Sequence, residues 1–582
     1  MGESKKMINA LVTGVFPDKV KIEVKDIDNF KVAGEKLSVG SYLRISDSED
    51  CAIIAIIENF CIEKDETDPE RKYVLEAIPI GFLDNEGRFL RGGNNIAIPP
   101  SAVEPANKEE IQKIYAQIEE NKIFSFSRLM QDDSIVVPVD GDRFFNKHIS
   151  IIGATGSGKS CALTSILQKA VKEKAGPYTG LNNSHIIIFD LHGEYQSAFP
   201  GANHLNADNL LLPYWLMNGE ELEELFVEAG EYQAYNQVSL LRSLITVNKQ
   251  RLNKDDKILF DSPVFFSIRQ VLNCIRNLSR ETRSADDPLR IMIKNNTQNF
   301  KSEGEKMDFY FQDKYEFEST RKAAPKQGIE GINKGTFNDG SLEKFISRIK
   351  NKITYNRLKF LLGKDVEKIT FRETLEQILS YKEKNEANIT IIDLSGVPFD
   401  VLSITVSLIT RLVFEFGYYF KRTINESADK APILLVYEEA HKYVPKSQSS
   451  KYKSSREAIE RVAKEGRKYA VTLVLLTQRP SEISETIFSQ CNNFVAMRLT
   501  NPDDQNYVKR LLPDSLGPLT ESLSILGSGD AILIGDSLVM PSLVKIDRCE
   551  PEPSSKDVSY LQEWKKEWIK VAFDEIIDNW SN

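Results

Sequence analysis

Residues 150–167, SIIGATGSGKSCALTSIL, join an apolar run to a glycine-rich loop and then to a helical pattern. Within this stretch, residues 153–160 match G-x-x-x-x-G-K-[ST] at every fixed position. The glycines leave room for successive backbone N–H groups to turn toward one anion, and a helix that begins near Lys159 adds its positive end. The stretch therefore predicts a strand, a phosphate-binding loop and a helix, which together begin an α/β fold.

The loop predicts a site for ATP and Mg²⁺. Lys159 is expected to reach the β- and γ-phosphates, and the hydroxyl of Ser160 is expected to bind Mg²⁺. The nucleotide is expected to lie against Gly153, Ala154, Thr155, Gly156, Ser157, Gly158, Lys159, Ser160 and Cys161. A glycine turn with an incidental lysine is the alternative, but it does not explain why every fixed position is filled between a strand and a helix.

Two carboxylates follow an apolar run in residues 432–441, PILLVYEEAH. Catalysis of phosphoryl transfer rests mostly on positioning and charge stabilisation, so one acid for the metal and one for water are sufficient. Glu438 is expected in the Mg²⁺ shell, where an aspartate is usual, and its longer side chain is expected to act through water. Glu439 is expected to polarise the attacking water. The alternative is a solvated acidic pair at a strand end.

A polar residue ends the apolar run of residues 471–480, VTLVLLTQRP. A glutamine on a strand beside the phosphate loop can sense the γ-phosphate and report its hydrolysis. Gln478 is therefore a candidate catalytic residue, and the alternative is a plain polar strand terminus.

Seven apolar runs predict a parallel sheet that is covered by helices on both faces. They are residues 149–153, 185–191, 389–394, 432–437, 471–477, 493–499 and 530–536. Residues 148–207 and 386–548 are assigned to this core. Residues 208–385, which are mostly helical by pattern, are assigned to an insertion between two core strands. The polar, glycine-rich segments 295–309 and 322–341 are expected to be loops.

The two ends of the chain differ from this core in pattern. Residues 1–100 contain short β-rich runs at close spacing, which predict a small barrel. Residues 101–147 begin as a proline-containing linker and continue as a helix over about 107–120. Residues 549–582 predict an amphipathic C-terminal helix over 556–580, whose three tryptophans are expected to pack across a neighbouring subunit rather than bind a cofactor.

Composition excludes several classes of protein. The formal net charge is -10, so any contact with nucleic acid must be local, because proteins that coat duplex DNA are usually basic overall. The six cysteines form no CxxC pair, which argues against a zinc site and a disulfide scaffold. No apolar run reaches the roughly 18 residues of a membrane span, and no signal peptide is recognised, so a cytoplasmic protein is expected.

Four ordered motifs resemble the HerA-type hexameric ATPases, within the HerA/FtsK group of DNA-pumping motors. They are GATGSGKS at 153–160, FDLHGEY at 189–195, YEEAHKYVP at 437–445 and GRKYAVTLVLLTQRPSEIS at 466–484. The resemblance extends over about residues 8–548. It implies a RecA-like P-loop core, an N-terminal barrel and a helical insertion after the second core strand.

The resemblance also implies a homohexamer that holds ATP between its subunits. A neighbouring subunit would then supply an arginine to the γ-phosphate, and the candidates are Arg461 and Arg467. The family tends to place another basic residue just before the phosphate-loop strand, where this chain has Lys147 and His148. The alternative for each arginine is a salt bridge on a helix surface.

Two further segments are candidate functional sites. Asp190, His192 and Glu194 follow the second core strand, where they would place Mg²⁺ or water, or only form hydrogen bonds within their loop. Residues 442–456 contain five basic residues, five serines and no acid, so this loop could grip DNA phosphates in a central pore. Its candidate contacts are Lys446, Lys451 and Lys453, and the alternative is a solvated loop.

Three hypotheses about function remain open from the sequence. In the first, a Mg²⁺-dependent ATPase ring translocates double-stranded DNA. The resemblance then implies a separate effector, a nuclease or a sirtuin-type NAD-consuming enzyme, that docks on the barrel in DNA-end processing or anti-phage defence. In the second, the ring is an ATP-switched scaffold that activates such an effector with little translocation. The third, a conjugation or secretion pump, usually has a membrane anchor, and no span is found in this sequence.

Overall fold

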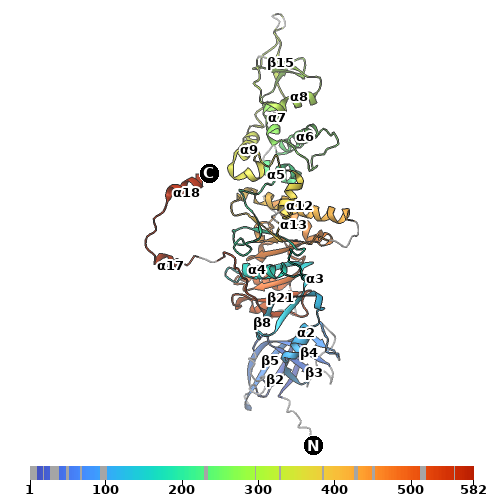
Figure 1. Ribbon diagram of the computed structural model, residues 1–582, viewed down its shortest axis with the longest axis vertical. Helices are drawn as coiled ribbons and strands as arrows, with labels where there is room; N and C mark the ends of the chain where they lie inside the picture. The colour runs from blue at the N-terminus through green and yellow to red at the C-terminus, as the bar shows by residue number, and fades with distance from the viewer. Residues whose placement is uncertain are drawn as a thin grey trace.

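The computed structural model is elongated, with an N-terminal sheet at one end, a large central sheet and an insertion at the far end (Figure 1). It describes residues 9–581 except 17–18, 27–29, 31–37, 47–50, 66–67, 85, 92–100, 228–233, 295, 325, 327–328, 383–385, 425–429, 448–451, 512–519 and 556–557. A C-terminal arm runs along one side of the molecule (Figure 1).

The N-terminal sheet curls until its two ends meet. Its strands are β1 (Ala10–Val15), β2 (Val20–Val24), β3 (Tyr42–Ser46), β4 (Ala52–Asp65), β5 (Asp68–Leu83), β6 (Phe89–Arg91) and β7 (Val103–Pro105). They follow the order β1-β2-β5-β4-β3-β7, with β6 beside β5. The N–H of Val12 donates to the carbonyl of Ser101 at 2.9 Å, which joins β1 to the segment that leads into β7. The result is a small, partly open barrel, as predicted, around buried residues such as Ile22, Leu43 and Leu75.

The segment after the barrel contains less helix and more strand than the sequence predicts. The helix expected over about 107–120 is α2 (Lys108–Tyr115), which begins with a capping box between Asn107 and Glu110. The segment 101–147, interpreted as linker and helix, also contains β8 (Ile123–Leu129) and β9 (Val136–Asp140), which extend the central sheet. Alternation of buried and exposed residues in β8 marks it as a strand, a signal that the linker interpretation missed.

The central sheet has a parallel part and an antiparallel part. Its order is β12-β17-β11-β18-β19-β10-β20-β21-β22-β8-β9. The first seven strands in this order are parallel, and the last four pair antiparallel. The strands not yet introduced are β10 (His148–Ile152), β11 (His185–Asp190), β12 (Asn203–Leu205), β17 (Ile389–Asp393), β18 (Ile433–Tyr437), β19 (Val471–Thr477), β20 (Cys491–Met497), β21 (Asp530–Gly535) and β22 (Ser542–Ile546).

Every residue of β10, β18 and β19 is buried, so both faces of the parallel part are covered. The helices of this layer include α4 (Lys159–Ala170), α12 (Phe399–Thr423) and α13 (Lys453–Glu465). Because parallel strands share their direction, the carboxyl ends of β10, β11, β18 and β19 meet at one edge of the sheet. The predicted α/β, RecA-like core is confirmed. The run 530–536, which was predicted to join the parallel sheet, instead forms β21 and pairs antiparallel with β20.

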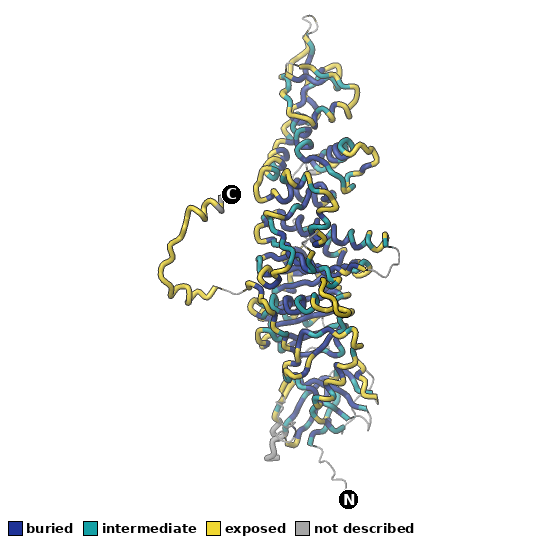
Figure 2. Tube along the Cα trace, viewed as in Figure 1, coloured by how far each residue is buried: buried dark blue, intermediate teal, exposed yellow. Residues whose placement is uncertain are grey.

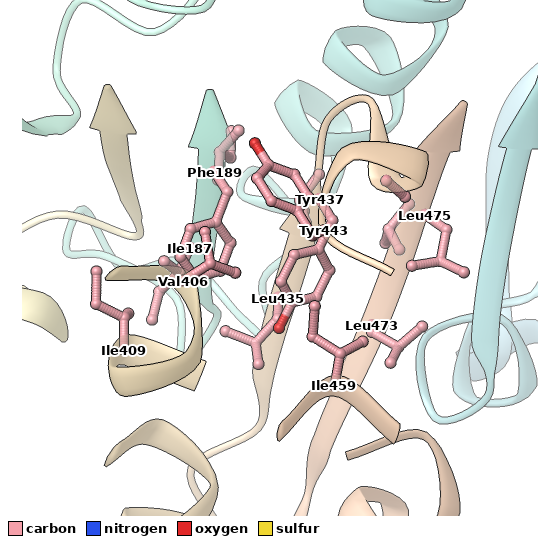
Figure 3. Close-up of a cluster of buried hydrophobic side chains, with 14 of the residues drawn as sticks. Ile187, Phe189, Val406, Ile409, Leu435, Tyr437, Tyr443, Ile459, Leu473 and Leu475 are labelled. Atoms are coloured by element: carbon pink, nitrogen blue, oxygen red, sulfur yellow. The ribbon is translucent and has the colours of Figure 1, made fainter. Parts of the chain in front are cut away.

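A cluster of aromatic residues fixes β11 and β18 against α12 (Figure 3). The rings of Phe189 and Tyr437 stack with centroids 4.9 Å apart, and the hydroxyl of Tyr437 lies 2.9 Å from Oγ1 of Thr410 on α12. Tyr437 directly precedes Glu438, so this packing also sets the position of the two carboxylates that follow.

The insertion between β12 and β17 contains helices and a small second sheet. The helices are α5 (Gly219–Phe226), α6 (Ala234–Asn253), α7 (Ile268–Arg280), α8 (Glu303–Gln312), α9 (Glu343–Thr354), α10 (Lys359–Leu362) and α11 (Phe371–Ile378). The sheet β15-β14-β13-β16 consists of β13 (Thr282–Ser284), β14 (Arg290–Ile293), β15 (Asn296–Asn299) and β16 (Ile332–Lys334).

The prediction of a loop over 295–309 was wrong, because β15 and most of α8 lie there. Ser302 caps α8 by accepting a hydrogen bond from the N–H of Glu305. The side chains of Tyr310 and Phe311 are buried and anchor the helix. Residues 322–341 contain β16 but otherwise little regular structure, as expected.

The single C-terminal helix predicted over 556–580 is also not found. Two short helices, α17 (Tyr560–Trp564) and α18 (Phe573–Ser581), are joined by an extended segment. Their described side chains are exposed (Figure 2), and Trp568 is 96% exposed. An amphipathic pattern without a surface to pack against does not hold a long helix together. Among the described residues, no helix has both the length and the apolar character needed to cross a bilayer.

Candidate nucleotide site

The glycine-rich loop lies between the carboxyl ends of β19 and β20. The N–H of Gly153 donates to the carbonyl of Thr477 at 3.2 Å, and the N–H of Ala154 donates to the carbonyl of Arg498 at 2.7 Å. Gly156 and Gly158 have φ of 73° and 99°, which side chains disfavour, so the motif glycines are required here. Helix α4 begins after Gly158 with no side-chain cap, which leaves its first N–H groups available to an anion.

Lys159 lies inside this loop. Its Nζ donates to the carbonyl of Ala154 at 3.3 Å. Burial lowers the pKa of Lys159, and the carboxylates of Glu439, Glu438 and Glu194 oppose that shift. The cation is therefore held among backbone groups and acids, where the phosphates of a nucleotide would become its natural partner.

Oxygen ligands suited to Mg²⁺ gather beside Lys159. The hydroxyl of Ser160 donates to Oε2 of Glu194 at 3.2 Å, and Oε2 of Glu438 accepts from the N–H of Leu191 at 2.8 Å. Burial, with the negative charges of Asp190 and Glu194, raises the pKa of Glu438 to about 9. This crowding of acids favours a cation, so the donor set fits Mg²⁺.

Protein groups alone would not complete a metal shell. Within the described part of the chain, no group of three or more His, Cys, Asp or Glu side chains is arranged to hold a metal ion. Mg²⁺ usually takes one or two protein ligands together with substrate phosphates and water. Ser160 and Glu438 are the residues that would hold Mg²⁺. Glu194, whose role the sequence leaves open, lies beside them.

Asp190 has a structural role in this site. Its Oδ1 accepts from the N–H groups of His192, Gly193 and Glu194 at 3.3, 2.8 and 3.1 Å. Its Oδ2 accepts from Tyr195 at 3.0 Å. The carboxylate is thus used to shape its own loop, which favours the hydrogen-bonding interpretation for Asp190, and the side chain of His192 is exposed.

Glu439 has an unusual backbone and an unsatisfied carboxylate. Its φ of 47° and ψ of 51° lie in the left-handed region, which turns the side chain back at the end of β18. Its Oε2 is buried and has no hydrogen-bond partner among the described residues, although His441 Nδ1 lies 3.3 Å away. A buried carboxylate oxygen without a partner suits a residue that binds water when substrate is present.

Gln478 lies on the other side of the loop from Arg498. Its Oε1 accepts a 2.7 Å hydrogen bond from Oγ1 of Thr155 in the phosphate loop. The preceding residue, Thr477, has its Oγ1 3.2 Å from Nδ1 of His441. The end of β19 therefore links the phosphate loop to the turn that contains Glu439.

Of the candidate residues for action in trans, Arg467 and Lys147 lie at the opposite edge of the sheet, before the amino ends of β19 and β10. Arg467 is exposed and lines a cavity of about 1140 Å³ between the amino ends of β11, β18 and β19. The guanidinium of Arg461 lies 4.5 Å from the ring centroid of Phe414. Lys147 forms an ion pair with Asp536.

His148 cannot act as a basic residue in trans. It is fully buried, its Nδ1 accepts from the N–H of Leu473 at 3.2 Å, and its Nε2 lies 2.8 Å from the carbonyl of Ala463. Nε2 therefore carries the proton and donates it, which defines a neutral imidazole. Burial lowers the pKa of His148 to about 4.

The candidate DNA contacts are only partly described. Lys446 and Lys453 are exposed, and each forms ion pairs within the chain, Lys446 with Glu485 and Lys453 with Glu220 and Glu457. Lys451 lies outside the described residues. The backbone of residues 444–446 pairs with that of 482–484, so this loop is attached to the segment that follows Gln478.

Two groups near the site are not marked by any local sequence pattern. Arg498 was not singled out, because only the sheet order places the end of β20 beside the phosphate loop. The segment 550–554 also lies against the site. The N–H of Glu550 donates to Oε1 of Gln168 on α4 at 3.0 Å, and that of Ser554 donates to the carbonyl of Glu194 at 2.9 Å.

A family model and curated relatives similar to this chain are described as HerA helicases. Residues 124–413 match the family model described as "Helicase HerA, central domain". The chain is 22% identical over 546 residues to the "Probable DNA double-strand break repair helicase HerA" of Methanocaldococcus jannaschii, which covers 91% of this chain and 95% of that protein. It is 27% identical over 478 residues to the "DNA double-strand break repair helicase HerA" of Saccharolobus solfataricus, which covers 81% of this chain and 77% of that protein. Among solved structures, VirB4 of Thermoanaerobacter pseudethanolicus aligns with a TM-score of 0.44 at 12% identity, over 74% of this chain and 98% of that one.

Proposed function

Since this chain belongs to the HerA-type P-loop ATPases, we propose that it forms a homohexameric ring that hydrolyses ATP with Mg²⁺ and translocates double-stranded DNA. In the proposed ring, each nucleotide lies between two subunits. One subunit supplies the phosphate loop and carboxylates, and its neighbour supplies Arg467.

The separation of these two parts within one chain carries the proposal. The phosphate loop lies at the carboxyl end of β19, and Arg467 lies before its amino end. A seven-residue strand spans about 20 Å at roughly 3.3 Å per residue. Arg467 therefore cannot reach the γ-phosphate of its own subunit, and an arginine near that phosphate would have to come from another copy. Arg461 is the weaker candidate, because it already stacks on Phe414.

The residues of the site then have separate tasks. Lys159 neutralises phosphate oxygens, and Ser160 with Glu438 holds Mg²⁺, whose charge would stabilise the phosphates. Glu439 accepts a hydrogen bond from the attacking water and orients it. Gln478 contacts the phosphate loop through Thr155, so it is placed to respond when the γ-phosphate leaves.

Movement at the site would be passed to DNA through the basic loop. Glu439 leads directly into residues 442–456, and residues 444–446 are paired with the segment after Gln478. A change at either residue would therefore shift Lys446, and Lys451 and Lys453 are the other proposed contacts in this loop. Such contacts would bind the phosphate backbone and read no sequence.

We also propose that the N-terminal barrel docks a separate effector, a nuclease or a sirtuin-type NAD-consuming enzyme, in DNA-end processing or anti-phage defence. The barrel forms one end of the molecule, with its free surface away from the insertion (Figure 1). It is fixed to the core by Arg91, which donates to the carbonyls of Val539 and Leu538 at 2.7 and 2.6 Å. A rigid connection of this kind would keep an effector aligned with the ring.

A subunit-mixing experiment tests the proposed function. ATPase activity is measured with and without duplex DNA for the wild type, Lys159→Ala, Arg467→Ala and a mixture of the two variants. Both variants should be inactive alone, and the mixture should regain part of the duplex-stimulated activity, because a Lys159→Ala subunit can supply Arg467 to a neighbour with an intact loop.

Two results would contradict the motor. If duplex DNA does not stimulate the wild type, the ring is not a motor on duplex DNA. If the mixture stays inactive although mixed rings form, Arg467 does not act in trans. Intact effector activity in Lys159→Ala would favour the scaffold over the motor. An effector that responds to ATP binding without translocation would favour the scaffold.

A further inference from the structure

Arg498 directly follows β20, the neighbour of the phosphate-loop strand on the side away from β19. Its carbonyl accepts the 2.7 Å hydrogen bond from the N–H of Ala154. This backbone contact holds the first turn of the loop, and any residue at position 498 could supply it. The loop geometry therefore does not require an arginine side chain.

The guanidinium of Arg498 nevertheless lies against the middle of the loop. Its Nη2 is 3.9 Å from the position that a Cβ on Gly156 would occupy. Its Nε is enclosed and has no hydrogen-bond partner among the described residues. Other arginine side chains in the described chain form ion pairs with acids, as Arg411 does with Glu221. Arg498 forms none with the residues that the structure describes, so a cation at the loop has unused hydrogen-bonding capacity.

Gln478 and Arg498 approach the same part of the loop from opposite sides. Gln478 contacts Thr155 from the end of β19, and Arg498 lies over Gly156 from the end of β20. Lys159 comes from the helix between them. A terminal phosphate beyond Gly156 would thus meet an amide, an ammonium and a guanidinium, and only the guanidinium offers a planar fork that fits two phosphate oxygens.

We propose that Arg498 binds the γ-phosphate of the nucleotide held by its own subunit and thereby gives the site its preference for nucleoside triphosphate over diphosphate. The inference rests on the proposed function, because it needs a nucleotide at the loop. It differs from the role of Arg467, which would act on a neighbour and mainly in hydrolysis.

The test measures nucleotide binding separately from hydrolysis. Binding of ATP and ADP with Mg²⁺ is measured in the full-length Glu439→Gln protein, where hydrolysis is expected to be slow. The measurement is repeated with Arg498→Ala, Arg498→Lys or Arg372→Ala added. Charge-assisted hydrogen bonds predict that Arg498→Ala weakens ATP binding about 10- to 100-fold. ADP binding should change less than about threefold, since ADP lacks the phosphate in question.

The two other variants serve as controls. Arg498→Lys keeps the charge but loses the fork, so it should recover part of the preference for ATP. Arg372 is exposed on α11 and forms an ion pair with Glu376, so Arg372→Ala should bind both nucleotides like the parent protein.

Several outcomes would overturn the inference. An equal loss of ATP and ADP binding, with a lower melting temperature, would mean that Arg498 only supports the loop. Unchanged binding of both nucleotides would mean that the guanidinium does not touch the phosphates. If the Glu439→Gln parent itself binds no ATP, the proposed function fails and the inference fails with it. This result differs from the two above, which overturn only the role of Arg498.

Discussion

His441 Nδ1 lies 3.3 Å from Oε2 of Glu439, the carboxylate proposed to orient water. The same nitrogen lies 3.2 Å from Oγ1 of Thr477, so His441 connects the two residues. Burial lowers the pKa of His441, which disfavours the charged form of the ring. The contact holds Glu439 next to the strand that ends in Gln478.

Loss of His441 should therefore slow turnover without weakening substrate binding. We expect His441→Ala to lower kcat about tenfold, a cost of about 1.4 kcal/mol in the transition state, with KM for ATP unchanged. His441→Asn, which can still donate near Nδ1, should recover part of the rate. Steady-state kinetics provide the check, and an increase in KM alone would refute this role.

Glu439→Gln should leave ATP bound but slow its hydrolysis. Removal of a general base typically costs about 10²–10⁴-fold in rate. Glu316 is 80% exposed in the insertion, so Glu316→Gln is a suitable control and should hydrolyse ATP at the normal rate. Single-turnover measurements with saturating ATP would detect the effect, and hydrolysis at the normal rate by Glu439→Gln would remove this residue from the mechanism.

His148 should make the folded protein sensitive to acid. Its pKa is about 4 in the folded protein, because burial and the charge of Arg467 disfavour protonation, against 6.5 ordinarily. Below pH 6.5 the unfolded chain binds a proton that the folded chain does not. The free energy of unfolding should therefore fall as the pH drops from 6.5 to 4, by up to about 3 kcal/mol from this residue.

His148→Gln isolates that contribution, since glutamine can also accept one hydrogen bond and donate another. Denaturant unfolding at several pH values should give a flatter pH dependence for the variant. His185, whose pKa burial also lowers, would keep a smaller slope of the same sign. An unchanged pH dependence would show that His148 is not the responsible group.

Lys446 and Lys453 should contribute to duplex binding through phosphates. Replacement of both by alanine should weaken binding uniformly across sequences and reduce the slope of log K against log salt by about 1 per lost contact. Lys368 is 77% exposed in the insertion, so Lys368→Ala should have no effect. Equal salt slopes for the double variant and the control would place the DNA path elsewhere.

Glu221 and Arg411 should stabilise the junction of the insertion with the core. Glu221 is fully buried, and Arg411 on α12 donates to its two oxygens at 3.2 and 2.8 Å. Arg411→Met leaves a buried carboxylate without its cation, so we expect a loss of about 3–5 kcal/mol in denaturant unfolding. Adding Glu221→Gln to Arg411→Met should recover part of the lost stability. A loss below about 1 kcal/mol for Arg411→Met alone would contradict a stabilising role for this pair.

The sequence was most informative where a local pattern has one physical solution. The spacing of 153–160 required a phosphate loop, and runs such as 471–477 required strands that are covered on both faces. It was least informative where position depends on distant strands. Arg498 reaches the loop only because β20 lies beside β10, and no local pattern reveals that order.

Local chemistry was also ambiguous at single residues. An aspartate at a strand end can bind a metal or shape its loop. Asp190 accepts hydrogen bonds from four backbone N–H groups, which favours the second role. The amphipathic pattern of 556–580 describes a helix that needs a partner surface, and the isolated chain provides none, so two short helices remain.

The placement of the insertion has a consequence for how such chains can diverge. Strands β12 and β17 are parallel neighbours at the rim of the sheet, and parallel neighbours always need a crossover between them. Everything from α5 to α11 is an enlargement of that one crossover. A segment of quite different size could replace it without changing the order of the core strands. This end of the molecule can therefore vary between related chains while the ATPase core stays the same.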